Sequence, residues 1–210
     1  MSKVSASLWT LMTLGSLMIA VVSYRYFLPH VQIPPDIGRN LMARPWLFVH
    51  AGMASTALLL GPFQFIASIR ARAPKVHRWI GRTYVFASLV AGVAGLLLAS
   101  GTDAGPVAQA GFGLLAVAWL FATAQAWRLA MAGRYAEHRR WMVRSFAMTF
   151  AAVTLRLYVP IGMALGVDFM EAYRAISWLC WVPNLMVAEL YLNWPRVRPQ
   201  LARADRPAVP

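Results

Sequence analysis

The chain has few charged residues, few acids and a single cysteine. Only 13% of its 210 residues are charged, against roughly 25% in an ordinary soluble domain, and 60% are hydrophobic. Cys180 has no second cysteine to pair with, so the chain is not a disulfide-bonded scaffold. The sequence also lacks CxxC and HExxH motifs, a nucleophile elbow, a phosphate-binding loop and a dinucleotide fingerprint. These absences argue against a soluble domain, hydrolysis and nucleotide-driven work.

Long apolar stretches fill the chain instead. Six of them are each long enough to cross a hydrocarbon layer of about 30 Å as a helix. They run over residues 8–28, 46–69, 79–100, 107–131, 141–165 and 173–194. The connections between them are short and polar, and residues 195–210 form a basic tail with four prolines. We therefore predict an all-α fold in which residues 1–210 form a single domain, an integral membrane bundle of six transmembrane helices.

The basic residues are distributed unevenly about these stretches. Fourteen lysines and arginines lie near the predicted span ends on one side, and four lie on the other. Basic loops resist translocation, so the richer side and both termini are predicted to be cytoplasmic. We expect a multi-pass protein of the inner membrane if the host is a bacterium. This asymmetry accounts for most of the formal charge of +13 without nucleic acid as a partner. The basic cytoplasmic face is expected to contact anionic lipid.

Two pairs of spans show a weak internal duplication. In the first pair Gln64 precedes a basic loop and His77, and in the second pair Gln125 precedes a basic loop and His138. When the copies are aligned on the tryptophan that follows each histidine, the glutamines and the histidines agree within one position. Two helical hairpins of the same orientation would then lie side by side. Chance is the alternative, because tryptophan and basic residues are common at a cytoplasmic membrane boundary.

Four histidines are the most informative polar residues. His30 and His50 lie towards the outer side, whereas His77 and His138 each mark the cytoplasmic start of a span. A neutral imidazole can ligate haem iron, and a helical bundle holds haem between facing helices. His50, His77 and His138 are therefore candidate iron ligands. The alternative for His77 and His138 is a polar anchor at the headgroup boundary, and His30 lies in a loop of uncertain geometry.

Arg156 is the only basic residue well inside a predicted span. At that depth a guanidinium needs an anion, a water-filled cavity or a route to the surface. Its partner is either a carboxylate, from Asp36, Asp168 or Glu171, or a bound group such as a haem propionate, a quinone oxygen or an anionic substrate. Arg156 is thus a candidate cofactor-binding residue near the level of His50, and a structural or snorkelling arginine is the alternative.

Further polar residues lie in or beside the spans. Glu189 is near the cytoplasmic end of the last span, where arginines such as Arg78 and Arg139 are plentiful. This placement predicts a structural salt bridge, with proton relay as the alternative. Gln64 and Gln125 are predicted to hydrogen-bond across helices and so to contribute to the specificity of the bundle.

Proline marks two places inside the predicted spans. The steps Gly61–Pro62 and Pro183–Asn184 are expected to kink their helices, because proline lacks the backbone N–H that continues a helix. The carbonyl groups that such kinks free inside a membrane need other hydrogen-bond partners.

A set of short motifs extends from the second to the fifth predicted span. The motifs are His50-Ala51-Gly52, Gly61-Pro62-Phe63-Gln64-Phe65, His77-Arg78-Trp79-Ile80-Gly81-Arg82-Thr83-Tyr84, His138-Arg139-Arg140-Trp141-Met142-Val143-Arg144-Ser145 and Thr154-Leu155-Arg156. With them the chain resembles, over about residues 46–165, a bacterial family of predicted multi-span membrane proteins, domain of unknown function 2306. The resemblance implies an integral membrane protein and no established reaction. A more distant similarity, of architecture alone, is to transmembrane b-type cytochromes.

Three classes of function remain open at the level of sequence. The first is a redox-associated membrane protein that holds haem b or quinone between its helices for transmembrane electron transfer to a membrane redox partner. Electron transfer needs no protein nucleophile, which fits the missing catalytic motifs. The alternatives are a small transporter or lipid- or anion-binding protein that uses Arg156, and a non-catalytic assembly factor for a membrane complex. The sequence leaves open whether the chain is an enzyme.

Overall fold

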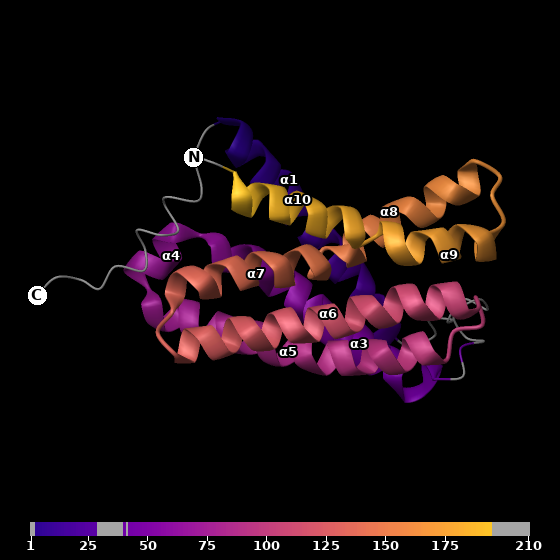
Figure 1. Cartoon of the computed structure of the whole chain (residues 1–210), viewed down its shortest axis with the longest axis horizontal. Coiled ribbons are helices and arrows are strands. Elements are labelled where there is room, and N and C mark those ends of the chain that lie inside the picture. Colours follow the sequence, from indigo (N-terminus) through magenta and orange to yellow (C-terminus); the bar gives the residue numbers. More distant parts are fainter. Residues whose placement is uncertain (1–2, 29–39, 41, 195–210) are drawn as a thin grey trace, which may run out of the picture.

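A computed structural model describes residues 3–28, 40 and 42–194, and over these residues all regular structure is helical (Figure 1). The α-helices are α1 Lys3–Ser23, α3 Ala43–Leu60, α4 Ala67–Arg72, α5 Pro74–Ser100, α6 Pro106–Met131, α7 Tyr135–Thr149, α8 Ala151–Ala164, α9 Phe169–Leu179 and α10 Val182–Asn193. Two 3₁₀ helices, η1 Tyr24–Phe27 and η2 Gly61–Phe65, follow α1 and α3. The predicted all-α class is confirmed. His30, Asp36 and the basic tail lie outside the described residues.

Six stretches of the described chain are long and apolar enough to cross a membrane. They are Trp9–Phe27, Pro45–Phe65, Pro74–Ser100, Pro106–Met131, Tyr135–Ala164 and Phe169–Asn193. Each overlaps one predicted span, so the six-span architecture is confirmed. The third and fifth spans begin earlier than predicted, because their helices already start in the basic segments that precede the apolar runs.

The described ends of the chain lie at one end of the bundle. Figure 1 shows the start of α1 and the end of α10 on the left, as an even number of spans requires. The start of α5 and the end of α6 lie there too. We call this the basic end, after Arg70, Arg72, Lys75, Arg78, Arg82, Arg134, Arg139, Arg140 and Arg144. That the basic end faces the cytoplasm stays a prediction.

Helices α3, α5, α6 and α7 pack against one another around the main hydrophobic core. Large aromatic side chains, Tyr84, Trp119 and Phe146, lie at its centre. Small side chains line the helix contacts around them, namely Ala57, Ala87, Ala91, Ala122 and Ala126. Small residues let helix backbones approach closely, which drives helix association where lipid offers no hydrophobic gain.

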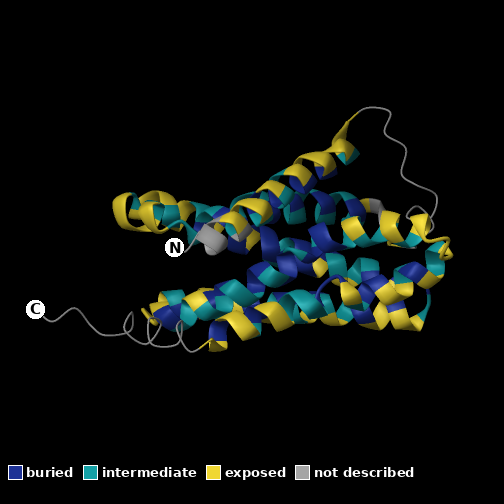
Figure 2. Cartoon of the chain, turned by 90° about the horizontal axis from the view of Figure 1, so that it is seen from above, coloured by how far each residue is buried: buried dark blue, intermediate teal, exposed yellow. Residues whose placement is uncertain are grey.

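The helices at the periphery expose large apolar side chains. Leu11 and Val21 of α1 are 67% and 66% exposed, and Val187 and Leu190 of α10 are similarly open. Figure 2 shows that exposed residues lie on the outward faces of the helices, whereas buried ones face the interior. An apolar surface of this kind is typical of contact with a membrane. The sides of the bundle therefore present an apolar surface to lipid.

The fifth and sixth spans are each broken near their middle. Helix α7 gives way to α8 at Phe150, and α9 gives way to α10 at Cys180 and Trp181, with Pro183 in the first turn of α10. The side-chain amide of Asn184 donates from Nδ2 to the carbonyl oxygen of Cys180 at 2.9 Å. The predicted interruption at Pro183–Asn184 is confirmed, and the asparagine supplies a partner for a carbonyl at the break.

Candidate functional site

His50 lies in the first half of α3 and contacts α5. Its Nδ1 lies 2.9 Å from the carbonyl oxygen of Ala91. A carbonyl oxygen only accepts, so Nδ1 carries the proton and donates, and Nε2 of the neutral ring is left unprotonated. The close approach depends on Gly95, because a Cβ there would lie 3.1 Å from His50 Nδ1. His50 therefore offers one nitrogen that can accept a hydrogen bond or ligate a metal.

Arg156 lies in α8, within the fifth span. Its Nη1 donates to the carbonyl oxygen of Ala152, one turn earlier in the same helix, at 3.1 Å. Among the described residues no carboxylate forms an ion pair with Arg156. Asp168 instead caps the start of α9, where its carboxylate accepts two backbone N–H groups. The sequence-based pairing of Arg156 with Asp168 or Glu171 is therefore wrong, and Asp36 lies outside the described part of the chain.

The polar neighbours of Arg156 come from three other elements. His50 of α3, Tyr26 of η1 and Tyr173 of α9 all lie close enough to interact electrostatically with its guanidinium. Arg25 of η1 adds a second positive charge. We call Arg156, His50, Tyr26 and Tyr173 the Arg156 cluster. The guanidinium of Arg156 and the hydroxyl groups of the two tyrosines can donate, and the charge of the cluster is positive, which suits a ligand with acceptor oxygens.

His77 and His138 lie at the basic end, in the first turns of α5 and α7, and are close enough to interact electrostatically. His138 Nδ1 donates to the carbonyl oxygen of Ala126 at 2.7 Å. His77 Nδ1 is buried without a hydrogen-bond partner among the described residues. The structure thus places both residues of the predicted inner pair at the basic end. The level of His50, at Ala91, lies further along α5 than His77 by roughly 20 Å, at 1.5 Å per residue.

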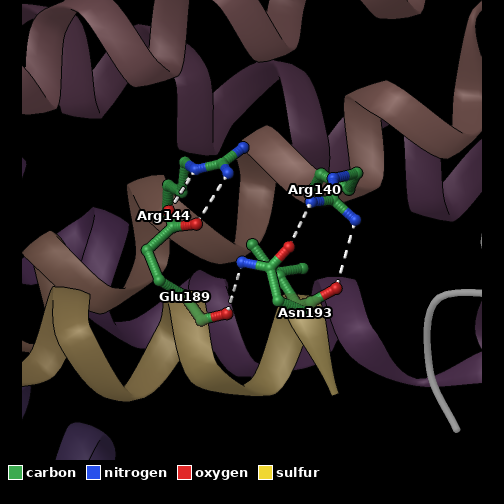
Figure 3. A network of polar contacts seen from close by, with 5 residues as sticks. Arg140, Arg144, Glu189 and Asn193 are labelled. Carbon is green, nitrogen blue, oxygen red and sulfur yellow. Dashed lines mark hydrogen bonds and ion pairs between the residues drawn. The ribbon is translucent and has the colours of Figure 1, made fainter. Parts of the chain in front are cut away.

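Glu189 of α10 forms an ion pair with one of the arginines at the basic end, as the sequence predicts (Figure 3). Arg144 of α7 donates from Nε and Nη2 to the two carboxylate oxygens at 2.5 and 2.9 Å. Beside this pair, Arg140 donates from Nη1 to the carbonyl oxygen of Leu192 at 3.1 Å. Both contacts join α7 to α10, so Glu189 holds two helices together.

The two glutamines have different environments. Gln125 Oε1 accepts from Arg128 Nε at 2.7 Å, so this hydrogen bond lies within α6 and not across helices as predicted. Gln64 lies in η2 and is buried, and its Nε2 has no partner in the described chain. Arg78 and Arg139 are exposed at the basic end.

A buried hydroxyl cluster in the main core was not predicted. Tyr84 Oη hydrogen-bonds with Ser145 Oγ (2.9 Å) and Thr149 Oγ1 (2.8 Å), and Ser145 Oγ hydrogen-bonds with Thr123 Oγ1 (2.7 Å). We call these four residues the Tyr84 cluster. Polar residues four apart share one helix face, which is a signal visible in the sequence. Three consecutive spans carry such a pair: Tyr84 and Ser88, Trp119 and Thr123, Ser145 and Thr149.

Metal-binding groups are sparse in the described part of the chain. Over residues 3–28, 40 and 42–194, no group of three or more His, Cys, Asp or Glu residues is placed to hold a metal ion. Cys180 is buried at the break of the sixth span. The groups that the bundle does bring together are imidazoles, a guanidinium and hydroxyls, and these suit hydrogen bonding to a ligand or axial ligation by a single imidazole.

Comparisons with known proteins bear on the chain as a whole. No curated protein and no solved structure matches it, so these comparisons lend no support to the analogy with b-type cytochromes. The family model described as "Predicted membrane protein (DUF2306)" matches residues 47–192. This match confirms the resemblance seen in the motifs and extends it through the sixth span. Since it covers more than two thirds of the chain, the chain belongs to the DUF2306 family of predicted membrane proteins.

Proposed function

We propose that this multi-pass membrane protein binds a ligand with anionic or carbonyl oxygen atoms at the Arg156 cluster. One observation carries the proposal: Arg156 lies inside a span, and no carboxylate of the described chain neutralises its guanidinium. Ionisable groups inside a membrane are costly and mark ligand or ion sites by default. A ligand that brings negative charge or acceptor oxygens would remove this cost.

The chemistry of the cluster narrows the ligand class. A guanidinium presents several N–H groups in one plane, which match the oxygens of a carboxylate or a phosphate. Tyr26 and Tyr173 interact electrostatically with Arg156, and their hydroxyl groups can donate to the same ligand. The ligand that fits best is an amphiphile or small organic molecule with one anionic group, as a transporter or a lipid-binding protein would take.

The variant Arg156→Gln tests the proposal. The full chain is purified in detergent and its extract is analysed by mass spectrometry. We expect an acidic small molecule to co-purify with the wild type and to be lost from the variant, while circular dichroism stays unchanged. Arg174→Gln is the matched control, because within the described residues Arg174 also bonds a backbone carbonyl, that of Ala104 at 2.7 Å, and no carboxylate. Identical extracts from wild type and Arg156→Gln would refute the proposal.

A redox role, with haem b or quinone between the helices, is the second candidate. In both His50 and His138 the Nδ1 proton goes to a backbone carbonyl, which is how metal-ligating histidines are commonly oriented. Their Nε2 atoms are then free to ligate iron, and His77 beside His138 is a third candidate ligand. Arg156 would meet a haem propionate or a quinone oxygen. Bound haem would supply one-electron chemistry.

The absorption spectrum of the purified protein tests the haem version. A Soret band in the wild type that weakens in His50→Ala or His138→Ala would support it, and a wild type without a Soret band would end it. For the quinone version, the extract of the wild type should contain a quinone that is lost with Arg156→Gln.

The membrane and the orientation are also part of the proposal. We place the protein in the inner membrane of a bacterial host, with the basic end in the cytoplasm, because basic segments resist translocation. A C-terminal alkaline phosphatase fusion, active only outside the cytoplasm, should then be inactive. Strong phosphatase activity would reverse the orientation.

A further inference from the structure

The two copies of the internal duplication carry the same polar residues but make different hydrogen bonds. In the second copy His138 Nδ1 donates to a backbone carbonyl and Gln125 accepts from Arg128. In the first copy Gln64 Nε2 and His77 Nδ1 are both buried without a partner among the described residues. A buried N–H group that lacks an acceptor loses its hydration and gains nothing in return. The amide Nε2 of Gln64 always needs an acceptor, and so does His77 Nδ1 when it carries the ring proton.

The difference between the copies originates in the backbone at Pro62. Helix α3 ends at Leu60 and η2 follows, because Pro62 has no N–H to continue the α-helical pattern. At the predicted kink, Gly61–Pro62, the backbone thus changes from an α-helix to a 3₁₀ helix. The corresponding position in the second copy is Thr123, and there α6 continues unbroken through Gln125. Because of the 3₁₀ turn, the side chain of Gln64 does not leave its helix in the α-helical direction that Gln125 has in α6.

The side chain of Gln64 reaches α5 at Gly81, one turn after His77. Gln64 Oε1 lies only 3.0 Å from the place that a Cβ of Gly81 would occupy. His77 precedes Gly81 by four residues and so shares its helix face. Arg70 and Arg78 both interact electrostatically with His77, and neither pairs with a carboxylate of the described chain. The junction of η2 and α5 therefore carries two unpartnered buried nitrogens and two arginines without a carboxylate partner in the described chain.

We propose that this junction binds a phosphate group through Gln64 Nε2 and His77 Nδ1, with Arg70 and Arg78 supplying positive charge. A phosphate fits because it offers several acceptor oxygens to donors that approach from different elements, and charge-assisted hydrogen bonds to it are strong. The group belongs to an anionic phospholipid or to inorganic phosphate, since both present the same oxygens. The junction lies at the basic end, where the second span ends and the third begins.

Three variants test the site without changing the net charge of the chain. Gln64→Leu removes the amide, and Gly81→Ala displaces it, because the added Cβ would meet Gln64 Oε1. Gln125→Leu is the matched control from the second copy. Each full-length protein is purified in neutral detergent. Native mass spectrometry measures its retention of phosphatidylglycerol, and equilibrium dialysis measures its binding of inorganic phosphate.

We expect saturable binding of one phosphate-bearing molecule by the wild type and by Gln125→Leu. Binding by Gln64→Leu and Gly81→Ala should be weaker by about tenfold, the loss typical of one hydrogen bond to a charged group. If the lipid shows this pattern, the source is the membrane; if inorganic phosphate shows it, the source is the solution. The proposal is overturned if the wild type binds neither probe saturably, or if Gln64→Leu binds as tightly as Gln125→Leu.

The outcome is independent of the function proposed for the Arg156 cluster. Arg156→Gln should keep the phosphate site intact, because Arg156 lies near the level of His50 and not at the basic end. If Gln64→Leu fails to fold by circular dichroism and gel filtration, Gly81→Ala decides the matter, since it displaces the Gln64 amide without removing any polar side chain.

Discussion

Replacing Tyr84 with phenylalanine removes one hydroxyl group from the Tyr84 cluster and leaves the ring in place. The ring is fully buried in the main core, so its packing stays as it is and the only space created is that of one oxygen atom. The change deletes two hydrogen bonds, to Ser145 Oγ and to Thr149 Oγ1. It therefore isolates the contribution of the hydroxyl group to stability.

The loss of stability depends on the hydrogen bonds that Ser145 and Thr149 retain after the substitution. Side-chain hydrogen bonds inside membrane proteins contribute about 0.6 kcal/mol each on average, so two of them amount to about 1 kcal/mol. Ser145 Oγ retains Thr123 at 2.7 Å, and Thr149 Oγ1 still donates to the Ser145 carbonyl at 2.9 Å. Neither partner is left unsatisfied, so no further desolvation penalty is added. We expect the free energy of unfolding to fall by about 1 kcal/mol.

Reversible unfolding in mixed detergent measures this loss. Tyr191→Phe is the control, because Tyr191 is exposed on α10 and its substitution should leave the free energy of unfolding unchanged. A double-mutant cycle with Thr149→Val should give a coupling energy of about 0.6 kcal/mol between Tyr84 and Thr149. A loss above about 3 kcal/mol for Tyr84→Phe, or a coupling energy of zero, would refute the reasoning.

Three further substitutions test the helix contacts by thermal unfolding or hydrogen exchange. Glu189→Gln should lower the free energy of unfolding by about 1 kcal/mol or less, since Glu189 is partly solvated. The loss should exceed that of Glu137→Gln, because the pair of Glu137 with Arg134 lies within one helix. Equal losses for the two variants would contradict this. Gly61→Ala should cost about 1–3 kcal/mol, because the new Cβ would lie 2.3 Å from Phe146 Cε2, whereas Gly113→Ala has 4.0 Å of clearance and should be neutral. Asn184→Leu removes a hydrogen bond at the break between α9 and α10. The amides around residues 180–186 should then exchange faster, with α6 unaffected, and unchanged exchange there would count against the role of Asn184.

The membrane-spanning architecture was readable from the sequence because lipid imposes one strong local requirement. Each span must satisfy its own backbone and present about 20 apolar residues. The break at Phe150 was not readable, because no proline or glycine marks it. The break separates two helices with different packing partners, since α7 packs against α10 and α8 packs against α9. A break of this kind depends on tertiary packing, whereas Pro183 marks the break in the sixth span directly.

Ionisable residues in spans were easier to predict than hydroxyl groups for a physical reason. A guanidinium such as that of Arg156 cannot be satisfied by its own helix alone, so it stands out by itself. A serine or threonine can donate to the carbonyl four residues earlier, as Thr13, Ser16 and Ser23 all do in α1. Single hydroxyl groups therefore carry no signal. The Tyr84 cluster is distinguished only because three neighbouring spans each carry two polar side chains four residues apart.

Gln64 and Gln125 show how far a local pattern determines a partner. Three residues after Gln125 comes Arg128, on the same face of a continuous helix, and the two side chains hydrogen-bond. Three residues after Gln64 comes Ala67, which offers no side-chain partner, and the extended residue Ile66 separates η2 from the helix that begins at Ala67. The missing local partner of Gln64 was therefore visible in the sequence. That its amide lies against α5 at Gly81 was not visible, because this contact requires the 3₁₀ turn and the packing of η2 against α5.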